Sequence, residues 1–227
     1  VRKLVDIIRS QPEICIKSVY SHLAEADNRE NKRFTLDQIE RFSSSCEQIK
    51  TAINQPFLRH ILNSDGIVNF GSNQFDMVRM GIGVFGISTN SVWKKKLQPV
   101  IAWKSTVSQL KKVSKGQSVG YNRTFIASKD LTIAVIPVGY GDGYRRSLSN
   151  GKGGVFIQGV FCATVGNVCM DMIMVDVTHI KAKSGDEVEI IGPNQQVETL
   201  AIQMGTIPYE LLTGISQRVH RSYINED

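Results

Sequence analysis

The chain has 227 residues, of which 41% are hydrophobic and 21% charged, and its formal net charge at pH 7 is +6. This composition is ordinary for a soluble globular protein with one large domain or two small ones. No run approaches the roughly 18 consecutive apolar residues that cross a bilayer, which excludes a helical membrane protein. There is no signal peptide and no initiator Met, so we expect a piece of a longer protein.

Residues 1–90 alternate predicted strands and helices. Residues 14–20 and 57–62 are short apolar runs typical of buried strands. Between them Thr35, with Gln38 three residues later, predicts a capping box. An apolar stripe at helical spacing follows until Pro56, made of Leu36, Ile39, Phe42, Cys46, Ile49 and Ile53.

Two further elements complete the first part. Asn63 and Ser64 are natural N-caps for a short helix, and residues 77–87 predict a third strand. Strands that alternate with helices predict a parallel sheet. An eight-fold β/α barrel needs around 250 residues, so residues 1–90 can form only part of one.

Residues 91–227 have a different texture, rich in Val, Ile, Gly and Thr. They predict a mainly antiparallel β domain closed by two short helices near residues 200–204 and 209–216. The predicted strands cover residues 100–110, 131–138, 155–161, 172–177 and 187–191. The fold class is therefore α/β plus all-β: an incomplete TIM-type β/α barrel, then a β-barrel-like C-terminal domain from about residue 91.

The four cysteines are widely spaced and form no C-x-x-C pair, which argues against a zinc ribbon or a thioredoxin-type redox site. We expect buried free thiols in a reducing cytoplasm, and no metal site. They are Cys15, Cys46, Cys162 and Cys169.

Several polar residues stand in apolar surroundings. Arg79 lies in an apolar run, where a guanidinium must be paired or must face a ligand. His22 follows a strand candidate, the position of barrel active sites, although a lone His is more often structural. Asn63 and Ser64 either bind a phosphate or simply cap a helix. Asp171 lies in a Met- and Cys-containing run, where a carboxylate is costly to bury.

Residues 139–146 read GYGDGYRR, a composition that resembles a phosphate-binding loop. Together with other segments this stretch resembles the alanine racemase family, in this order: YSHLAEAD (20–27), LNSDG (62–66), MVRMGIGVFG (77–86), VGY (119–121), IPVGYGDGYRR (136–146) and VGNVCMDMIMVDV (165–177). The resemblance covers nearly the whole chain.

The resemblance implies a pyridoxal 5′-phosphate enzyme of fold type III, with a TIM barrel, a β domain and an active site shared across a homodimer. It would interconvert L- and D-alanine for peptidoglycan synthesis in the cytoplasm. Arg79 would donate to the pyridine nitrogen, and His22 would link Arg79 to the catalytic tyrosine. Ser64, Gly81 and Ile82 would bind the phosphate, with Asn63 beside them.

The resemblance also implies roles for the second part of the chain. Tyr121 would be one of two acid/base groups, which act on opposite faces of the substrate Cα. Met170 would meet the substrate carboxylate through its backbone N–H, and Asp171 beside it would also bind the substrate. Tyr140 would line the entrance to the active site. The resemblance therefore assigns the GYGDGYRR loop to the entrance and not to the phosphate site.

The chain departs from the family pattern at several places. It lacks the Schiff-base lysine, held in an A-x-x-K-A-N-A-Y-G type stretch, and the arginine that meets the substrate carboxylate. We therefore expect the chain to be inactive by itself. Gln217 replaces a tyrosine and Asn167 an arginine of many members.

Two other functions stay open at this point. One is another fold type III enzyme, such as a broad racemase or a decarboxylase. The other is a non-catalytic basic β-barrel binding module, because the excess positive charge lies in residues 91–227. Nucleic acid is not the expected partner, since no aromatic residues are interleaved with the lysine clusters.

Overall fold

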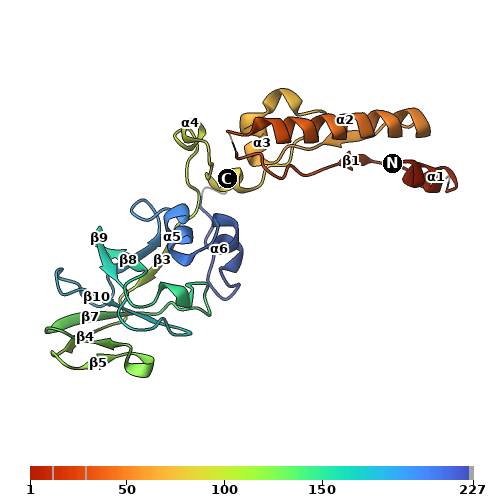
Figure 1. Cartoon of the computed structure of the whole chain (residues 1–227). Coiled ribbons are helices and arrows are strands. Elements are labelled where there is room, and N and C mark those ends of the chain that lie inside the picture. Colours follow the sequence, from red (N-terminus) through yellow and green to blue (C-terminus); the bar gives the residue numbers. More distant parts are fainter. Residues whose placement is uncertain (12, 29, 225–227) are drawn as a thin grey trace. The chain divides into compact units, whose positions relative to one another are not determined.

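A computed structural model describes residues 1–11, 13–28 and 30–224. The chain divides into two compact units, Val1–Val100 and Ile101–Asp227. Figure 1 shows the elements of each unit in chain order. Among the described residues, no helix is both long and apolar enough to cross a membrane.

The first unit is built from helices around a small parallel sheet. Its elements are α1 (Arg2–Arg9), β1 (Ser18–Tyr20), α2 (Lys32–Ile53), β2 (Leu58–His60), α3 (Ser64–Asn69), the 3₁₀ turns η1 (Gly71–Asn73) and η2 (Ile82–Phe85), and α4 (Ser91–Lys94). Strands β1 and β2 pair in parallel, with Ser18 opposite Leu58 and Tyr20 opposite His60. The predicted β/α alternation is confirmed, and the described residues form no closed barrel.

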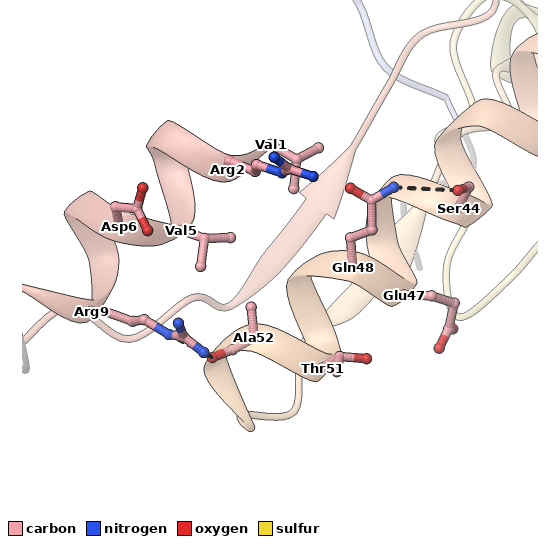
Figure 2. A pocket seen from close by; sticks show the side chains of 10 residues that line it. All are labelled: Val1, Arg2, Val5, Asp6, Arg9, Ser44, Glu47, Gln48, Thr51 and Ala52. Carbon is pink, nitrogen blue, oxygen red and sulfur yellow. Dashed lines mark hydrogen bonds between the residues drawn. The ribbon is translucent and has the colours of Figure 1, made fainter.

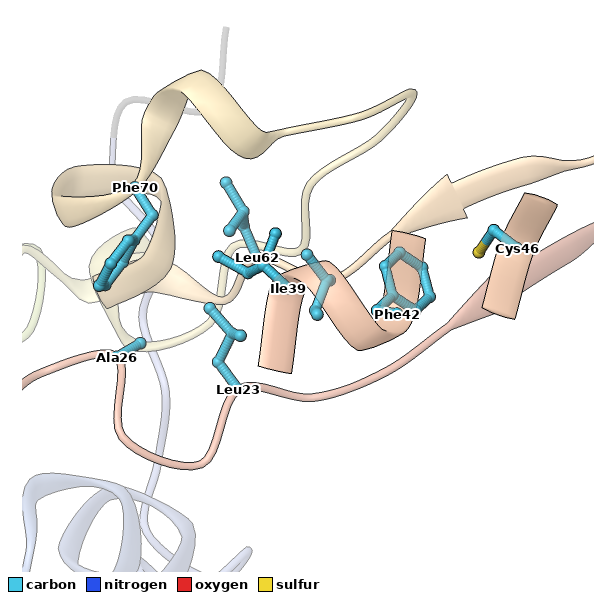
Figure 3. Packing of buried hydrophobic residues seen from close by; sticks show 8 residues of the cluster. Leu23, Ala26, Ile39, Phe42, Cys46, Leu62 and Phe70 are labelled. Carbon is cyan, nitrogen blue, oxygen red and sulfur yellow. The ribbon is translucent and has the colours of Figure 1, made fainter. Parts of the chain in front are cut away.

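Helix α2 covers the sheet with its apolar stripe. Ile39, Phe42 and Cys46 from α2 pack against Leu23 and Leu62, which follow β1 and β2 (Figure 3). The stripe differs from the prediction at its start. Leu36 is exposed and Thr35 is fully buried, because the helix begins at Lys32, three residues before the predicted cap.

The predicted capping box is therefore wrong. The Thr35 hydroxyl donates to the carbonyl of Glu25 (3.1 Å). The Gln38 side chain accepts from the Ala24 N–H (3.1 Å) and donates to the His22 carbonyl (2.6 Å). Both side chains stabilise the loop that follows β1 instead of the helix end, and this loop carries a candidate site residue.

The predicted strand at residues 77–87 is also wrong. The segment starts alongside β2, since the Asp76 and Arg79 N–H groups donate to the carbonyls of Arg59 and Leu62. It then turns into η2, which ends at Gly86 with φ of 78°. A Cβ at Gly86 would lie 2.1 Å from the Gln98 carbonyl oxygen, so the glycine permits a close backbone approach that a regular strand would not make.

The second unit is mainly antiparallel, as predicted. It contains β3 (Trp103–Thr106), β4 (Gln109–Val113), β5 (Ser118–Val119), η3 (Tyr121–Arg123), β6 (Phe125–Ile126), β7 (Leu131–Ile136), η4 (Arg146–Leu148), β8 (Gly154–Ile157), β9 (Val160–Ala163), β10 (Ile173–Asp176), β11 (Glu187–Ile191), α5 (Val197–Met204) and α6 (Pro208–Gly214). The sheet orders are β10-β7-β4, β3-β11-β8-β9 and β5-β6.

Two predicted strands are in fact pairs of strands. The run at 100–110 contains β3 and the start of β4, and the run at 155–161 is the β8–β9 hairpin. Gln158 and Gly159 both have positive φ (54° and 76°). This is the conformation of a two-residue type I′ turn, which matches the twist of the paired strands.

The four cysteines are free thiols, as expected from their spacing. Cys46 and Cys162 are buried, as predicted, but the predicted burial is wrong for Cys15, which is exposed, and Cys169 is only half-buried. Burial raises the pKa of the Cys162 thiol to about 11, so Cys162 behaves as a small apolar core residue.

Candidate active site

Arg79 lies at the carboxyl ends of the two parallel strands. Its Nη2 donates to the Ser21 carbonyl (2.8 Å) and lies 3.3 Å from Nδ1 of His22. Its Nη1 lies 2.6 Å from Nδ1 of His60 and donates to the His60 carbonyl (3.2 Å). The sequence placed His22 and Arg79 in one site, and the structure brings them together.

These contacts determine which ring nitrogen of each imidazole is unprotonated. A guanidinium has five N–H donors and no acceptor, so each Nδ1 that faces it must be an unprotonated acceptor. Burial first, and then the charge of Arg79, lower the pKa of His60. The four contacts use the N–H groups of both Nη atoms. The Nε–H is left without an acceptor among the residues that the structure describes.

Tyr20 and His60 extend this cluster and were not predicted from the sequence. The Tyr20 ring stacks on His60, with ring centroids 5.4 Å apart and an interplanar angle of 8°. The Arg79 guanidinium lies 5.3 Å from the Tyr20 ring centroid. His60 ends β2 as Tyr20 ends β1, and this shared strand end is the signal that could have identified it.

Ser64 joins two helix starts beside the arginine. Its Oγ accepts from the N–H groups of Gly81 (2.9 Å) and Gly83 (3.2 Å). A hydroxyl that accepts twice still has its proton to donate. Asn63 caps α3, since its side chain accepts from the Gly66 N–H at 2.9 Å.

The starts of α3 and η2 therefore meet at Ser64. The first N–H groups of a helix have no partner within that helix, which makes such a start a ready acceptor of anions. Ser64 begins α3 and Ile82 begins η2. The Gly81 N–H, which the sequence assigned to the phosphate, donates to Ser64 in this structure.

In the second unit, the GYGDGYRR loop lies against the segment that contains Met170. The N–H groups of Tyr140 and Gly141 donate to the carbonyls of Cys169 (3.0 Å) and Met170 (2.9 Å). A Cβ at Gly139 would lie 2.3 Å from the Cys169 oxygen. The glycines permit this backbone contact and do not form a phosphate cradle.

The backbone contact also sets the direction of the Met170 N–H. In a trans peptide the N–H and C=O groups point in opposite directions. The Cys169 carbonyl points at Tyr140, so the Met170 N–H of the same peptide points away from the loop. It has no acceptor in the part of the chain that the structure describes, which suits a ligand donor.

Arg218 joins this loop to the same segment. Its Nε donates to Asp142 (2.8 Å), and its Nη2 donates to Asp171 (2.7 Å) and approaches the Met170 carbonyl (3.4 Å). Asp142 in turn accepts from the Gly139 N–H (2.8 Å). Asp171 is thus held in an ion pair. Sequence reasoning missed Arg218, which lies 47 residues from Asp171 along the chain.

Tyr121 begins η3 and exposes 70% of its surface. Its carbonyl accepts from Asn167 (3.1 Å), so its backbone is held while its ring is open to solvent. Residues 165–171 therefore contact the backbone at both Tyr121 and Tyr140. The predicted site residues form two groups: His22, Asn63, Ser64, Arg79, Gly81 and Ile82 in the first unit, and Tyr121, Tyr140, Met170 and Asp171 in the second.

A separate pocket of about 760 Å³ lies between α1 and α2 (Figure 2). The Arg9 guanidinium closes one end, where its Nη2 donates to the Ala52 carbonyl (2.6 Å). None of the residues that line this pocket belongs to either candidate group. The pocket reflects the packing of two neighbouring helices.

Both parts of the chain match family models. Residues 1–89 match the alanine racemase N-terminal domain, and residues 100–223 match the alanine racemase C-terminal domain. An alanine racemase of Clostridium novyi is 39% identical over 229 residues, which cover 97% of this chain and 59% of that protein. The chain thus spans about 59% of the length of such relatives.

Solved structures agree with these matches. The crystal structure of the Bartonella henselae alanine racemase with covalently bound pyridoxal phosphate has a TM-score of 0.84 and 32% identity, covering 99% of this chain and 62% of that one. The alanine racemase of Streptomyces coelicolor A3(2) has a TM-score of 0.90 and 28% identity, covering 99% and 61%. By sequence and by fold, the chain belongs to the alanine racemase family.

Proposed function

We propose that the complete protein is a pyridoxal 5′-phosphate-dependent racemase that interconverts L- and D-alanine, and that this chain carries part of its active site. The observation that carries the proposal is the environment of Arg79. Two imidazoles and two carbonyls occupy four of its N–H groups and leave the Nε–H for a ligand. A single acceptor such as a pyridine nitrogen fits that remaining donor.

The residues around Arg79 fit the rest of the cofactor. The Ser64 hydroxyl proton, the Ile82 N–H and the start of α3 would hold the phosphate. Asn63 would keep the start of α3 in place through its cap. Gly81, whose N–H binds Ser64, would let the backbone approach the phosphate closely. When bound, the cofactor supplies an electron-withdrawing ring that makes the substrate Cα–H more acidic.

Arg79 would determine how strongly the cofactor ring withdraws electrons. A guanidinium keeps its proton at all ordinary pH values, so as a donor it leaves a pyridine nitrogen unprotonated. His22 and His60 would hold it in place as neutral acceptors. In this proposal His22 and His60 are positioning residues, because they act through Arg79.

The second unit would supply a proton carrier and the entrance. Tyr121 would exchange a proton with one face of the substrate Cα. The Met170 N–H would donate to the substrate carboxylate, with Asp171 beside it, and Tyr140 would line the entrance. In the proposed homodimer these residues serve the partner subunit's site, as the exposure of Tyr121, Tyr140 and Met170 permits.

The lysine context that anchors the cofactor in the family does not occur in these 227 residues. We therefore propose that this chain by itself binds the cofactor without a covalent link and does not racemise alanine. The complete protein would act in the cytoplasm and supply D-alanine for peptidoglycan.

Cofactor binding is tested by titrating this chain with pyridoxal 5′-phosphate and measuring equilibrium binding. We expect saturable binding that Arg79→Ala weakens at least about 10-fold, or about 1.4 kcal/mol. Arg41→Ala, at an exposed position on α2, is the matched control. Pyridoxal without the phosphate should bind more weakly. Equal binding by wild type and Arg79→Ala would refute the assignment.

The acid/base role is tested in the complete protein by Tyr121→Phe. Loss of a general acid/base group lowers turnover by about 10² to 10⁴. Thermal stability should stay unchanged, because the Tyr121 side chain is largely exposed. An unaltered racemisation rate would remove Tyr121 from the mechanism.

A further inference from the structure

The turn that carries Tyr121 has an unusual backbone. Gly120 has a φ of 79°, and the two residues after Tyr121, Asn122 and Arg123, have φ of 59° and 51°. Two successive non-glycine residues in the left-handed region are disfavoured, because each Cβ approaches its own carbonyl. Such a backbone persists only where its surroundings hold it.

Asn167 is a buried polar side chain that contacts this turn. It is 5% exposed, and its Nδ2 donates to the Tyr121 carbonyl at 3.1 Å. Its Oδ1 accepts from Nδ2 of Asn150 at 3.1 Å. Both ends of the amide are therefore engaged, which fixes its orientation without any choice of flip.

The backbones of the two segments also touch. A Cβ at Gly120 would lie 3.4 Å from the Asn167 nitrogen, and a Cβ at Gly166 would lie 2.8 Å from the Val119 oxygen. Arg123 adds a weaker hold from the solvent side, where its Nε donates to the Ser118 hydroxyl at 3.1 Å. Within the described residues, Asn167 is thus the buried side chain that donates a hydrogen bond to the turn.

We infer that Asn167 is a positioning residue for Tyr121. Its amide fixes the Tyr121 carbonyl, keeps Asn122 and Arg123 in the left-handed conformation, and so sets the direction in which the exposed phenol leaves the backbone. The catalytic part of this inference rests on the proposed function, whereas the conformational part does not.

The first experiment measures amide hydrogen exchange in this chain at Arg123, whose N–H donates to the Gly120 carbonyl (3.4 Å), and in the paired strands β5 and β6 on either side of the turn. Asn167→Asp keeps the shape of the side chain but replaces the donor with an acceptor, which faces the Tyr121 carbonyl. We expect exchange there to become at least about 10-fold faster, the loss of one hydrogen bond of about 1.4 kcal/mol. Unchanged exchange would overturn the inference.

The matched control is Asn73→Asp. It introduces the same charge. Among the residues that the structure describes, the Asn73 side chain accepts from the Ser72 hydroxyl through its Oδ1 and donates to none, and a carboxylate can also accept. Exchange at Arg123 and in β5 and β6 should not change in this control. If the buried charge of Asn167→Asp prevents folding, Asn167→Ala removes the donor without a charge and should give the same local effect.

The second experiment uses the complete protein and racemase turnover. Asn167→Ala should lower kcat at least about 10-fold and leave KM for alanine nearly unchanged. With alanine deuterated at Cα, the isotope effect should rise for only one enantiomer, the one whose proton faces Tyr121. An equal rise for both, or an unchanged kcat, would contradict the positioning role. If the wild-type complete protein shows no racemase activity, the proposed function fails, and the exchange experiment still decides the conformational part.

Discussion

The two units hold their candidate residues in opposite ways. In the first unit, side chains surround one cation, and Arg79 contacts two imidazoles and two carbonyls. In the second unit, backbone hydrogen bonds and glycines, together with Arg218 and Asn167, hold the loops. The side chains of the candidate residues stay open there: Tyr121, Tyr140 and Met170 expose 70%, 48% and 47% of their surface.

This difference follows from what each group must do. A partly buried guanidinium is costly unless acceptors surround it, so the first unit completes the site of Arg79 from its own residues. The Tyr121 phenol, the proposed acid/base group, would have to reach a substrate, and the second unit fixes its backbone and leaves its side chain open. Substitution of Arg79 should therefore act through lost side-chain contacts, whereas substitution of a glycine in the second unit should act through lost backbone contacts.

The largest expected effect is that of Gly139→Ala on the second unit. The new Cβ would lie 2.3 Å from the Cys169 oxygen and 2.4 Å from the Met170 oxygen, so the two backbones must separate. Lost hydrogen bonds and overpacking together should lower the free energy of unfolding by about 2–4 kcal/mol. Urea denaturation measures this loss.

Gly71→Ala is the control for this change, because a Cβ there meets nothing within 4 Å. It should leave stability within about 0.5 kcal/mol of wild type. Equal losses of stability in Gly139→Ala and Gly71→Ala would show that the close backbone contact at Gly139 does not stabilise the second unit.

The next effect is that of Arg79→Lys on the first unit. An ammonium keeps the charge but has only three donors at one point, and four acceptors face Arg79. At least one partly buried acceptor loses its partner, which should cost about 1–3 kcal/mol. Arg41→Lys, on the exposed face of α2, is the comparison. Equal denaturation midpoints for the two variants would show that the charge alone is sufficient.

The smallest effects concern pH, and they differ in sign between the units. The pKa of His60 is lowered from 6.5, mainly by burial and also by Arg79. Below pH 6.5 the unfolded chain takes up a proton that the folded chain resists, so stability is lost as the pH falls. His60→Asn, which keeps an acceptor for Arg79, should reduce this acid-side loss.

Tyr144 affects the stability of the second unit at alkaline pH. It is fully buried, its hydroxyl donates to the Gly154 carbonyl at 3.2 Å, and burial raises its pKa above 10.0. Above that pH the unfolded chain ionises first, so stability falls as the pH rises. Tyr144→Phe should lower the free energy of unfolding by about 1 kcal/mol near neutral pH. Above about pH 10 the difference in this free energy between the variant and wild type should become smaller. Thermal denaturation at several pH values tests both His60→Asn and Tyr144→Phe. A variant whose stability changes with pH in parallel with wild type would contradict the corresponding prediction.

The regular elements were largely predictable from the sequence. The apolar periods of residues 39–49 and 187–191 identified α2 and β11, because burial of one face or two faces determines those patterns. The sequence did not reveal the start of α2, since Thr35 and Gln38 bind the loop after β1 and not their own helix. The sequence also did not indicate that residues 77–87 leave the sheet and form a 3₁₀ turn.

The sequence by itself determined the order of the elements, the family resemblance and most of the polar residues that could carry chemistry. Those depend on local periodicity and on residue type, which a linear pattern contains. The tertiary structure alone decided the partners: His60 with Arg79, Ser64 with Gly81, Arg218 with Asp171, and Asn167 with Tyr121. Each pair joins residues 17 to 47 positions apart, and a polar group that far along the chain finds its acceptor only when folding brings the segments together.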